Sequence, residues 1–286
     1  MNQIEITLPK FLYRYFPKDN YTKSIFNRNE LFFRNPNEFN DPFDCKPLLT
    51  SERDWNQEEY IRFVINLAND SLGRYLNNGE KQSYENGARD KFINSDRNQL
   101  CREFNKIIKE HLAKSINEFR ILCLSEKYND ILMWSHYADK HRGFVLQFDT
   151  EVLLQSFSPR PQEIFYPPEE SYPSIKDFNE KGCMNMFLIT KSSHWAYEKE
   201  WRILMHIEDE DNPEEEGKVY RFEKGLITGI IFGCEMKSPE KTEISEWVRE
   251  YQPQIIPYDA IKDDNFYHIN AMPQLNECGY SPSKIS

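Results

Sequence analysis

The sequence lacks the close cysteine pairs that bind zinc, since no C-x-x-C spacing occurs in its 286 residues. Its six cysteines are scattered, and several lie in apolar segments where the side chain acts as a small hydrophobic group. They are Cys45, Cys101, Cys123, Cys183, Cys234 and Cys278. Neither a zinc site nor the disulfide framework of a small secreted protein is expected.

Long apolar runs and a surplus of positive charge are also missing. No window approaches the ~18 consecutive apolar residues of a membrane-spanning helix, and residues 1–10 carry no apolar signal core. The net charge of -11 argues against broad binding to nucleic-acid phosphates, because counterion release needs a basic surface. A local basic groove remains compatible with it. We expect a cytoplasmic protein that makes no membrane contact.

The sequence does contain enough apolar material for one large α+β domain over residues 1–286. With 20 Phe and 16 Tyr, it can fill an extensive core. Alternating or continuous apolar segments predict strands, and apolar spacing of three to four residues predicts helices. Strands are predicted at 11–16, 31–34, 120–125, 144–149, 201–207, 226–233, 255–258 and 266–269, with short helices near 130–138, 184–191 and 238–251.

A helical insertion is predicted at about 50–118. Apolar side chains follow helical spacing from Tyr60 to Leu76 and again from Leu100 to Ile116. The polar run between these segments, up to Asn98, predicts a loose connection. The insertion is therefore expected to consist of two long helices without chemistry of their own.

Two glutamates lead into the predicted strand at 201–207. The apolar alternation of that strand runs through Trp201, Ile203, Met205 and Ile207. The same register places Glu198, Glu200 and Arg202 on the opposite face. Like charges at this spacing repel, so the pair needs solvent, a cation or a ligand. Two interpretations stay open: a solvated strand edge neutralised by Arg202 and nearby lysines, or two carboxylates that line a cleft.

Arg14 lies inside the aromatic strand at 11–16, between Tyr13 and Tyr15. An arginine in this setting needs an anion or a group of carbonyls, because its unpaired burial is unfavourable. The alternative is a half-exposed side chain stacked on the two tyrosines.

The helix near 130–138 is expected to begin at Asn129 or Asp130, and Gly143 is placed to end the following turn with positive φ. Its histidines, His136 and His141, suggest a metal site, but residues five apart diverge by about 140° on a helix. A structural or substrate-contacting histidine is the favoured interpretation, and no metal ligands are assigned.

Five sequence blocks, spread over nearly the whole chain, occur in the order found in the domain-of-unknown-function family 2971 (DUF2971). They are Leu12-Tyr-Arg-Tyr, Phe39-Asn-Asp-Pro-Phe-Asp44, Cys123-Leu-Ser-Glu126, Met133-Trp-Ser-His-Tyr-Ala-Asp-Lys-His-Arg-Gly143 and Trp195-Ala-Tyr-Glu-Lys-Glu-Trp-Arg202. The chain therefore resembles this bacterial family, whose members are often encoded near defence genes. That resemblance implies a role in bacterial conflict or phage defence, as a toxin or effector, without naming a reaction.

The order of four residues is also similar to the Arg–Ser–Glu class of ADP-ribosyltransferases. Arg14 on a first strand, Ser125 on a central strand, and Glu198 and Glu200 before a later strand match the class residue by residue. Two departures are the Leu-Ser-Glu context of Ser125, where the class has Ser-Thr-Ser, and the long helical insertion. This resemblance implies a split, mostly antiparallel ADP-ribosyltransferase-like sheet and NAD as the substrate.

The same resemblance implies a role for each matched residue. Glu200 would stabilise the oxocarbenium-like ribose and bind a ribose hydroxyl, and Glu198 would orient or deprotonate the acceptor. Arg14 would hold a pyrophosphate oxygen, and Ser125 would brace the catalytic glutamate. The remaining cofactor-binding positions are Tyr13, Trp134, His136, Tyr137 and Trp195, with the Asn40-Asp41 loop as a further wall of the pocket.

Two alternatives remain open from the sequence. A non-catalytic binding or sensor module of the same fold would account for the acidic charge and the missing Ser-Thr-Ser. A metal-dependent hydrolase or nuclease would use Asp41, Asp44, His136 and His141. Expected partners are an acceptor, either protein or nucleic acid, and an antitoxin or neighbouring defence protein.

Overall fold

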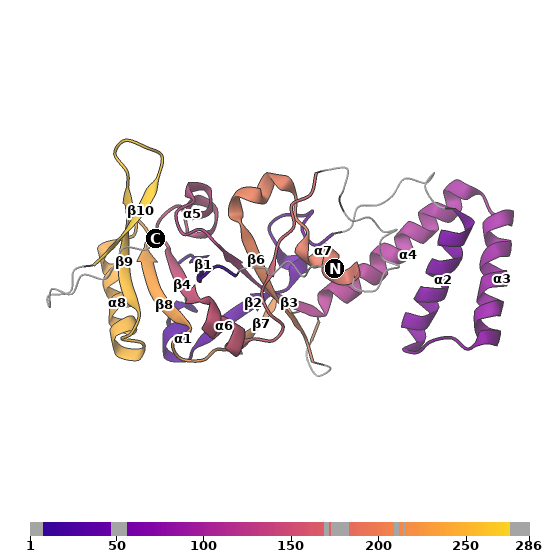
Figure 1. Cartoon of the computed structure of the whole chain (residues 1–286), viewed down its shortest axis with the longest axis horizontal. Helices are drawn as coiled ribbons and strands as arrows, with labels where there is room; N and C mark the ends of the chain where they lie inside the picture. The colour runs from indigo at the N-terminus through magenta and orange to yellow at the C-terminus, as the bar shows by residue number, and fades with distance from the viewer. Residues whose placement is uncertain are drawn as a thin grey trace. The chain divides into compact units, whose positions relative to one another are not determined.

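The computed structural model describes residues 8–46, 56–168, 172, 183–208, 212–213 and 215–274. The chain divides into two compact units. The sheet unit comprises Met1–Asn35, Arg120–Ile164 and His194–Ser286, and the helical unit comprises Pro36–Phe119 and Phe165–Ser193. Figure 1 shows the elements of both units, coloured by position along the chain.

The sheet unit is built on one mostly antiparallel sheet, which confirms the predicted α+β class. Its strands are β1 (Phe11–Phe16), β2 (Glu30–Arg34), β3 (Phe119–Ser125), β4 (Phe144–Asp149), β5 (Gln162–Glu163), β6 (Glu200–His206), β7 (Gly217–Arg221), β8 (Ile227–Phe232), β9 (Ile256–Lys262) and β10 (Ile269–Pro273). The order is β10-β9-β8-β4-β1-β3-β2-β7, with β6 paired to β3 and β5 paired to β6. The pair β8–β9 is parallel.

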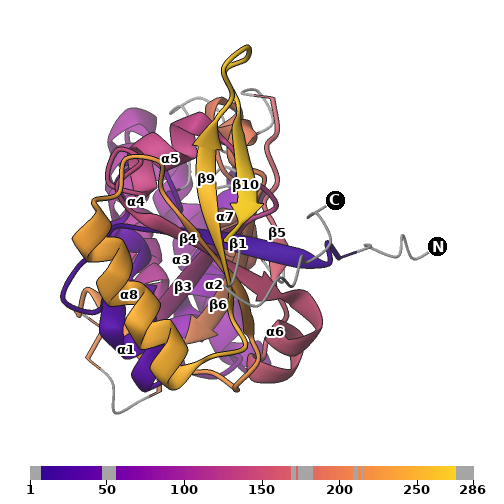
Figure 2. The ribbon, with the colours of Figure 1, turned by 90° about the vertical axis from the view of Figure 1, so that its left-hand side faces the viewer.

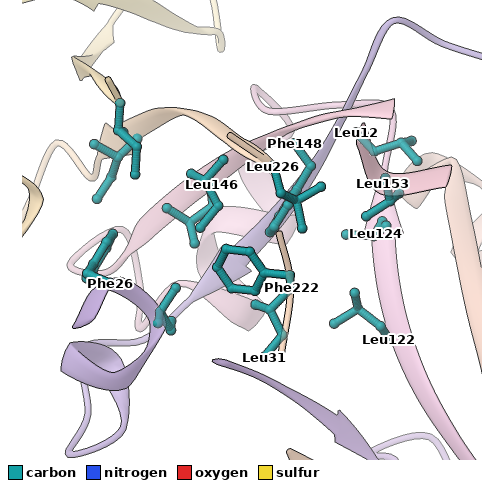
Figure 3. Close-up of a cluster of buried hydrophobic side chains, with 14 of the residues drawn as sticks. Leu12, Phe26, Leu31, Leu122, Leu124, Leu146, Phe148, Leu153, Phe222 and Leu226 are labelled. Carbon is teal, nitrogen blue, oxygen red and sulfur yellow. The ribbon is translucent and has the colours of Figure 1, made fainter. Parts of the chain in front are cut away.

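Both faces of the central strands are buried, and the side chains alternate between two apolar clusters. On β4, Leu146 and Phe148 belong to the main core, whereas Val145 belongs to the opposite cluster. The main core is covered by α1 (Thr22–Asn27), α6 (Thr150–Ser156) and α8 (Ser238–Tyr251), all of which contribute side chains to it. Figure 3 shows part of this core, including Phe26 of α1 and Leu153 of α6. The opposite face is covered by α5 (Ile131–Tyr137).

Helices α1 and α8 lie side by side in both views of the ribbon (Figures 1 and 2). The buried side chain of Gln252, just after α8, fixes this arrangement. Its Nε2 donates to the carbonyls of Ile25 and Phe26 at 3.2 and 3.1 Å, and to Oδ1 of Asn29 at 3.0 Å. One buried amide therefore satisfies the free carbonyls near the end of α1.

The strand β3 has only one register pair with each of two neighbours. Its Ile121 pairs with Arg34 of β2, and its Ser125 pairs with Tyr13 of β1. In contrast, β1 has six register pairs with β4. The strands β1, β2 and β3 therefore meet at a narrow junction, with Cys123 midway between the two paired residues of β3.

The last strand begins later than predicted. The segment 266–269 was expected to be a strand, but Phe266 and Tyr267 lie in the β9–β10 turn and are 75% and 99% exposed. Asp263 shapes this turn, because its carboxylate accepts the backbone N–H groups of Asn265 and Phe266. The hairpin projects beyond its neighbours in the sheet unit (Figure 2).

The helical unit contains three long helices where two were predicted. They are α2 (Gln57–Leu72), α3 (Asn78–Asn94) and α4 (Arg97–Asn117), accompanied by the short helix η1 (Pro36–Glu38) and by α7 (Cys183–Ile189). The expected loose connection was wrong because it contains α3, which begins with a capping box formed by Asn77 and Glu80. Only Ala88 and Phe92 of α3 are buried, so its apolar periodicity is weak. None of the helices in the described part of the chain is long and apolar enough to cross a membrane.

Candidate functional site

The glutamate pair lies at the start of β6, but only one of the two glutamates belongs to the strand. Glu200 is the first residue of β6, whereas Glu198 ends the 3-10 helix η4 (Ser193–Glu198). Lys199 between them has a φ of +46°, a left-handed conformation that interrupts the alternation. The predicted common strand register for both glutamates was therefore wrong, although Trp201 and Ile203 do enter the main core as expected.

Glu200 and Arg202 form a buried ion pair on β6. The Nε of Arg202 donates to Oε1 of Glu200 at 2.7 Å, and its terminal nitrogen Nη2 donates to Oε2 at 3.2 Å. The two residues are 4% and 0% exposed. Arg202 thus neutralises Glu200 as one interpretation expected, but the pair is buried, so the solvated strand edge of that interpretation was wrong. A guanidinium bound to both oxygens favours the ionised form of a buried carboxylate.

Glu198 is also buried, and its side chain and backbone are held by different partners. The hydroxyl of Tyr137, at the end of α5, donates to Oε1 of Glu198 at 2.7 Å. The hydroxyl of Ser125, at the end of β3, donates to the backbone carbonyl of Glu198 and accepts the N–H of Lys127. Ser125 was expected to hold the side chain of Glu200 in place. Its hydroxyl binds the backbone of Glu198 instead.

Arg14 extends from β1 into the junction of β1, β2 and β3. One terminal nitrogen, Nη2, donates to the carbonyl of Phe32 on β2 at 3.4 Å, and the guanidinium lies 5.2 Å from the ring centre of Phe16. Burial lowers the pKa of Arg14 to about 10. The charges of Cys123 and Glu200 raise the same pKa, and the charge of Arg34 lowers it.

Two of the aromatic residues predicted to bind the cofactor are core residues instead. Trp134 is fully buried, donates from Nε1 to the carbonyl of Tyr128 at 2.8 Å, and packs edge-on against Tyr15. Tyr13 is buried as well, and its hydroxyl accepts a bond of 3.2 Å from Gln147. The ring of Trp134 has no open face on which a nicotinamide or adenine can stack, so its predicted stacking role was wrong.

The other predicted aromatic residues form a partly exposed rim beside Glu198. His136, at an exposed position of α5, contacts the ring of Trp195 on η4, with 6.3 Å between ring centres. Trp195 in turn contacts Tyr197 at 6.0 Å, and Tyr137 contacts His136 at 6.1 Å. The structure thus brings three of the predicted residues together, with Tyr197 as an addition. This rim is defined by His136, Tyr137, Trp195 and Tyr197.

The loop after α5 is held in a left-handed turn. Asp139, Lys140 and His141 have φ values of +45°, +56° and +67°. Positive φ was predicted for Gly143 instead, and that prediction was wrong. Gly143 is needed for a different reason, because a Cβ at this position would overlap the carbonyl oxygen of Phe16.

His141 packs within this loop and does not approach a metal-ligating partner. Its Nε2 lies 3.1 Å from the hydroxyl of Ser135, and its ring stacks on Trp134 with 6.1 Å between ring centres. Burial lowers the pKa of His141, while the charges of Glu235 and Lys262 act in opposite directions. This supports the structural interpretation of the histidine.

Asn40 and Asp41, predicted as a pocket wall, belong to the helical unit, whereas Glu200 belongs to the sheet unit. Asp41 accepts the backbone N–H of Phe43 at 2.9 Å, as a turn-forming aspartate does. Asp44 is buried and lies 3.7 Å from the ammonium group of Lys191. Within the described ranges, no group of three His, Cys, Asp or Glu side chains is arranged to hold a metal ion.

A pocket of about 360 Å³ lies among the long helices of the helical unit. Its walls include Tyr60, Leu67, Tyr84 and Leu100, together with the half-exposed pair Lys91–Glu103. Apolar walls and a solvent-screened ion pair provide no group poised for chemistry. The buried carboxylates of the sheet unit are therefore the stronger candidate for a functional site.

Two residues near the candidate site were not assigned a role from the sequence, Cys123 and Arg34. Both occupy strand positions that share a face: Arg34 pairs with Ile121, and Cys123 is two residues further along β3. The alternation of side chains along each strand predicts which residues of one strand share a face. That Arg34 and Cys123 share a face could be inferred only once the pairing of β2 with β3 was known.

A family model with the description "Protein of unknown function (DUF2971)" matches residues 133–203. The matched segment begins within α5 and ends within β6, so it contains His136, Tyr137, Glu198, Glu200 and Arg202. Searches of curated proteins and of solved structures gave no significant match. The segment similar to the family model thus coincides with the part of the chain that carries the buried carboxylates and the aromatic rim.

Proposed function

We propose that the chain is an ADP-ribosyltransferase-like enzyme that uses NAD and acts in bacterial conflict or defence. The observation that carries this proposal is the pair of buried carboxylates, Glu198 and Glu200, in the same unit as the half-buried Arg14 of β1. Burial lowers the pKa of Arg14, and the charge of Glu200 raises it. Ser125 holds the backbone of Glu198. Residues far apart in sequence therefore contribute to one region of the sheet unit.

In the proposed reaction, the bond between C1′ of the ribose and the nicotinamide nitrogen breaks. Nicotinamide leaves with the bonding electrons, and positive charge develops on the ribose. The ionised carboxylate of Glu200, fixed by Arg202, would stabilise that charge without reorganising. An acceptor nucleophile then forms the new bond to C1′ and gives its proton to Glu198.

The supporting groups have roles that fit this chemistry. The hydroxyl of Tyr137 holds the Glu198 carboxylate in one position, which a general base requires. The half-buried rings of Trp195 and Tyr197 provide apolar faces beside it, suited to a flat heterocycle such as nicotinamide or adenine. The guanidinium of Arg14 suits an oxygen of the diphosphate.

Release of nicotinamide from labelled NAD tests the proposal, with cell lysate or nucleic acid supplied as acceptor. Glu198→Gln and Glu200→Gln should each reduce turnover by about 100-fold, as loss of one electrostatic stabiliser does. Glu246→Gln is the matched control, because this glutamate lies at an exposed position of α8. If the wild-type protein neither binds NAD nor releases nicotinamide, the proposal is wrong.

A second candidate function is a non-catalytic binding or sensor module. One observation favours it: Arg202 already occupies both carboxylate oxygens of Glu200. A glutamate engaged in this way can be a purely structural partner of the arginine. This candidate predicts that NAD or a related nucleotide binds without being cleaved, and that a folded Glu200→Gln variant keeps the biological effect.

A further inference from the structure

The pocket of the helical unit is formed by one face of each of three helices. Helix α2 contributes Tyr60, Val64 and Leu67, whose spacing of four and three residues places them on one side of the helix. Helices α3 and α4 form the other walls. The volume of about 360 Å³ falls within the usual range of small-molecule sites, roughly 300–1,000 Å³. The lining residues belong to one unit of the chain, so the pocket is a property of that unit.

The pocket combines a buried floor with an exposed apolar rim. Tyr60, Ala88 and Leu100 are buried, whereas Tyr84 of α3 and Ile107 of α4 are exposed. Exposed apolar side chains around a concave site mark a surface that a ligand can cover. The two tyrosine rings favour a flat ring in the ligand, because aromatic pairs stabilise each other beyond the area that they bury.

Gly87 lies within α3 and lines the pocket. A glycine inside a helix is less stable than an alanine, so its presence at this position needs a reason. Packing against the described residues does not supply one, because a Cβ at Gly87 would meet no atom within 4 Å. A larger side chain would narrow the pocket, however. Gly87 therefore keeps the pocket open although it lowers the stability of the helix.

The charges at the pocket cancel. Nζ of Lys91 and Oε2 of Glu103 lie 3.8 Å apart, and both side chains are about half exposed. A cationic ligand would be repelled by Lys91, and an anionic ligand would be repelled by Glu103. A neutral ligand leaves the pair intact.

We propose that this pocket binds a small, uncharged and mainly apolar molecule that contains a flat ring. The ring packs against Tyr60 and Tyr84, and the aliphatic walls of α2 and α4 enclose the rest of the molecule. No reaction accompanies the binding. The site is separate from the proposed NAD site, because Glu198 and Glu200 belong to the sheet unit, and NAD carries a charged diphosphate that the pocket does not suit.

Equilibrium dialysis of the full chain against three naphthalene derivatives of similar shape tests the ligand class. They are 2-naphthalenemethanol, which is neutral, 2-naphthoate, an anion, and 2-naphthylmethylamine, a cation. The alcohol should bind, and each charged compound should bind at least tenfold more weakly. NAD should not displace the alcohol.

Substitutions on α3 test the place of binding. Gly87→Leu should weaken binding of the alcohol at least tenfold, while urea unfolding shows a chain at least as stable as the wild type. Asn86→Leu is the matched control, because Asn86 is exposed on the same helix and does not line the pocket. Tyr84→Ala should also weaken binding and keeps the test informative if Gly87→Leu does not fold. Its control is Tyr75→Ala, since Tyr75 is exposed outside the pocket.

Several results would overturn the inference. They are no binding of the alcohol, stronger binding of either charged compound, and equal effects of the pocket variants and their controls. A wild-type dimer that Gly87→Leu dissociates, seen by sedimentation, would also overturn it, because a second copy would then cover the pocket. Binding of the alcohol that depends on Gly87, found together with no release of nicotinamide from NAD, supports the inference and contradicts the proposed enzyme.

Discussion

Arg202 binds both carboxylate oxygens of Glu200, two residues earlier on the same strand, and both side chains are buried. Two charges removed from water in this way stabilise each other only as a pair. Removal of either charge should therefore be costly to the fold.

Replacement of one partner should destabilise the protein strongly. Arg202→Leu takes the guanidinium away from a buried carboxylate, and the free energy of unfolding should fall by about 3–5 kcal/mol. The double variant Glu200→Leu/Arg202→Leu should be more stable than Arg202→Leu, because the buried carboxylate is removed as well. Urea unfolding measures both, and Arg142→Ala, which breaks an exposed pair with Asp139, serves as a control with little change. A double variant less stable than Arg202→Leu would contradict this account.

The hydroxyl of Tyr137 should stabilise the fold through Glu198. Tyr137→Phe removes the donor to a buried carboxylate and should lower the free energy of unfolding by about 1.5–3 kcal/mol. Tyr267→Phe is the control, because this hydroxyl belongs to a side chain that is 99% exposed. The same urea experiment compares them, and equal stability of the two variants would show that Glu198 does not depend on Tyr137.

Replacement of glycine by alanine should destabilise the fold at Gly143 and stabilise it at Gly87. Gly143→Ala places a Cβ against backbone atoms of Phe16 and Ala138, which cannot move aside easily, and should destabilise by about 2 kcal/mol or more. At Gly87, within α3, the added methyl group would have open space around it, so Gly87→Ala should stabilise by about 0.5–1 kcal/mol. Thermal unfolding of both variants provides the measurement. A neutral Gly143→Ala would mean that the turn after α5 can shift.

His141 should make stability depend on pH. In the folded chain, burial lowers the pKa of His141 below its ordinary value of 6.5. The unfolded chain therefore binds a proton at a pH where the folded chain does not. The free energy of unfolding therefore falls as the pH drops below about 6.5, toward the folded pKa. This loss should be smaller in His141→Gln, as measured by urea midpoints at pH 7.5 and 5.5. The same loss in both proteins would show that other groups cause it.

Much of the fold was predictable because it depends on local patterns. The strands β1, β3, β4, β6 and β8 lie where apolar runs or alternation placed them, and Asp130 caps α5 as expected. Helix α3 was missed because it buries only Ala88 and Phe92. Its stability comes from capping and from contact with α2, and neither leaves an apolar period in the sequence.

The candidate site was predictable in composition more than in geometry. Tyr137 and Ser125 were named as site residues, but not as partners of Glu198. Ser125 was expected beside Glu200 and instead binds the backbone of Glu198, while Tyr137 binds the Glu198 carboxylate. The left-handed conformation of Lys199 could not be anticipated from a lysine, since residues with a Cβ rarely adopt it. Burial of Trp134 depends on the long-range approach of Tyr15, which no local pattern reports.

The single register pair between β1 and β3 gives the sheet a line of low mechanical resistance. Separation of β1 from β4 requires six register pairs to open, whereas separation of β1 from β3 requires one. Separation of β3 from β2 also requires one register pair to open, so under a pulling force across the strands the sheet should part first along one side of β3. Arg14 connects β1 directly to β2 across this line, because its guanidinium donates a hydrogen bond to the carbonyl of Phe32.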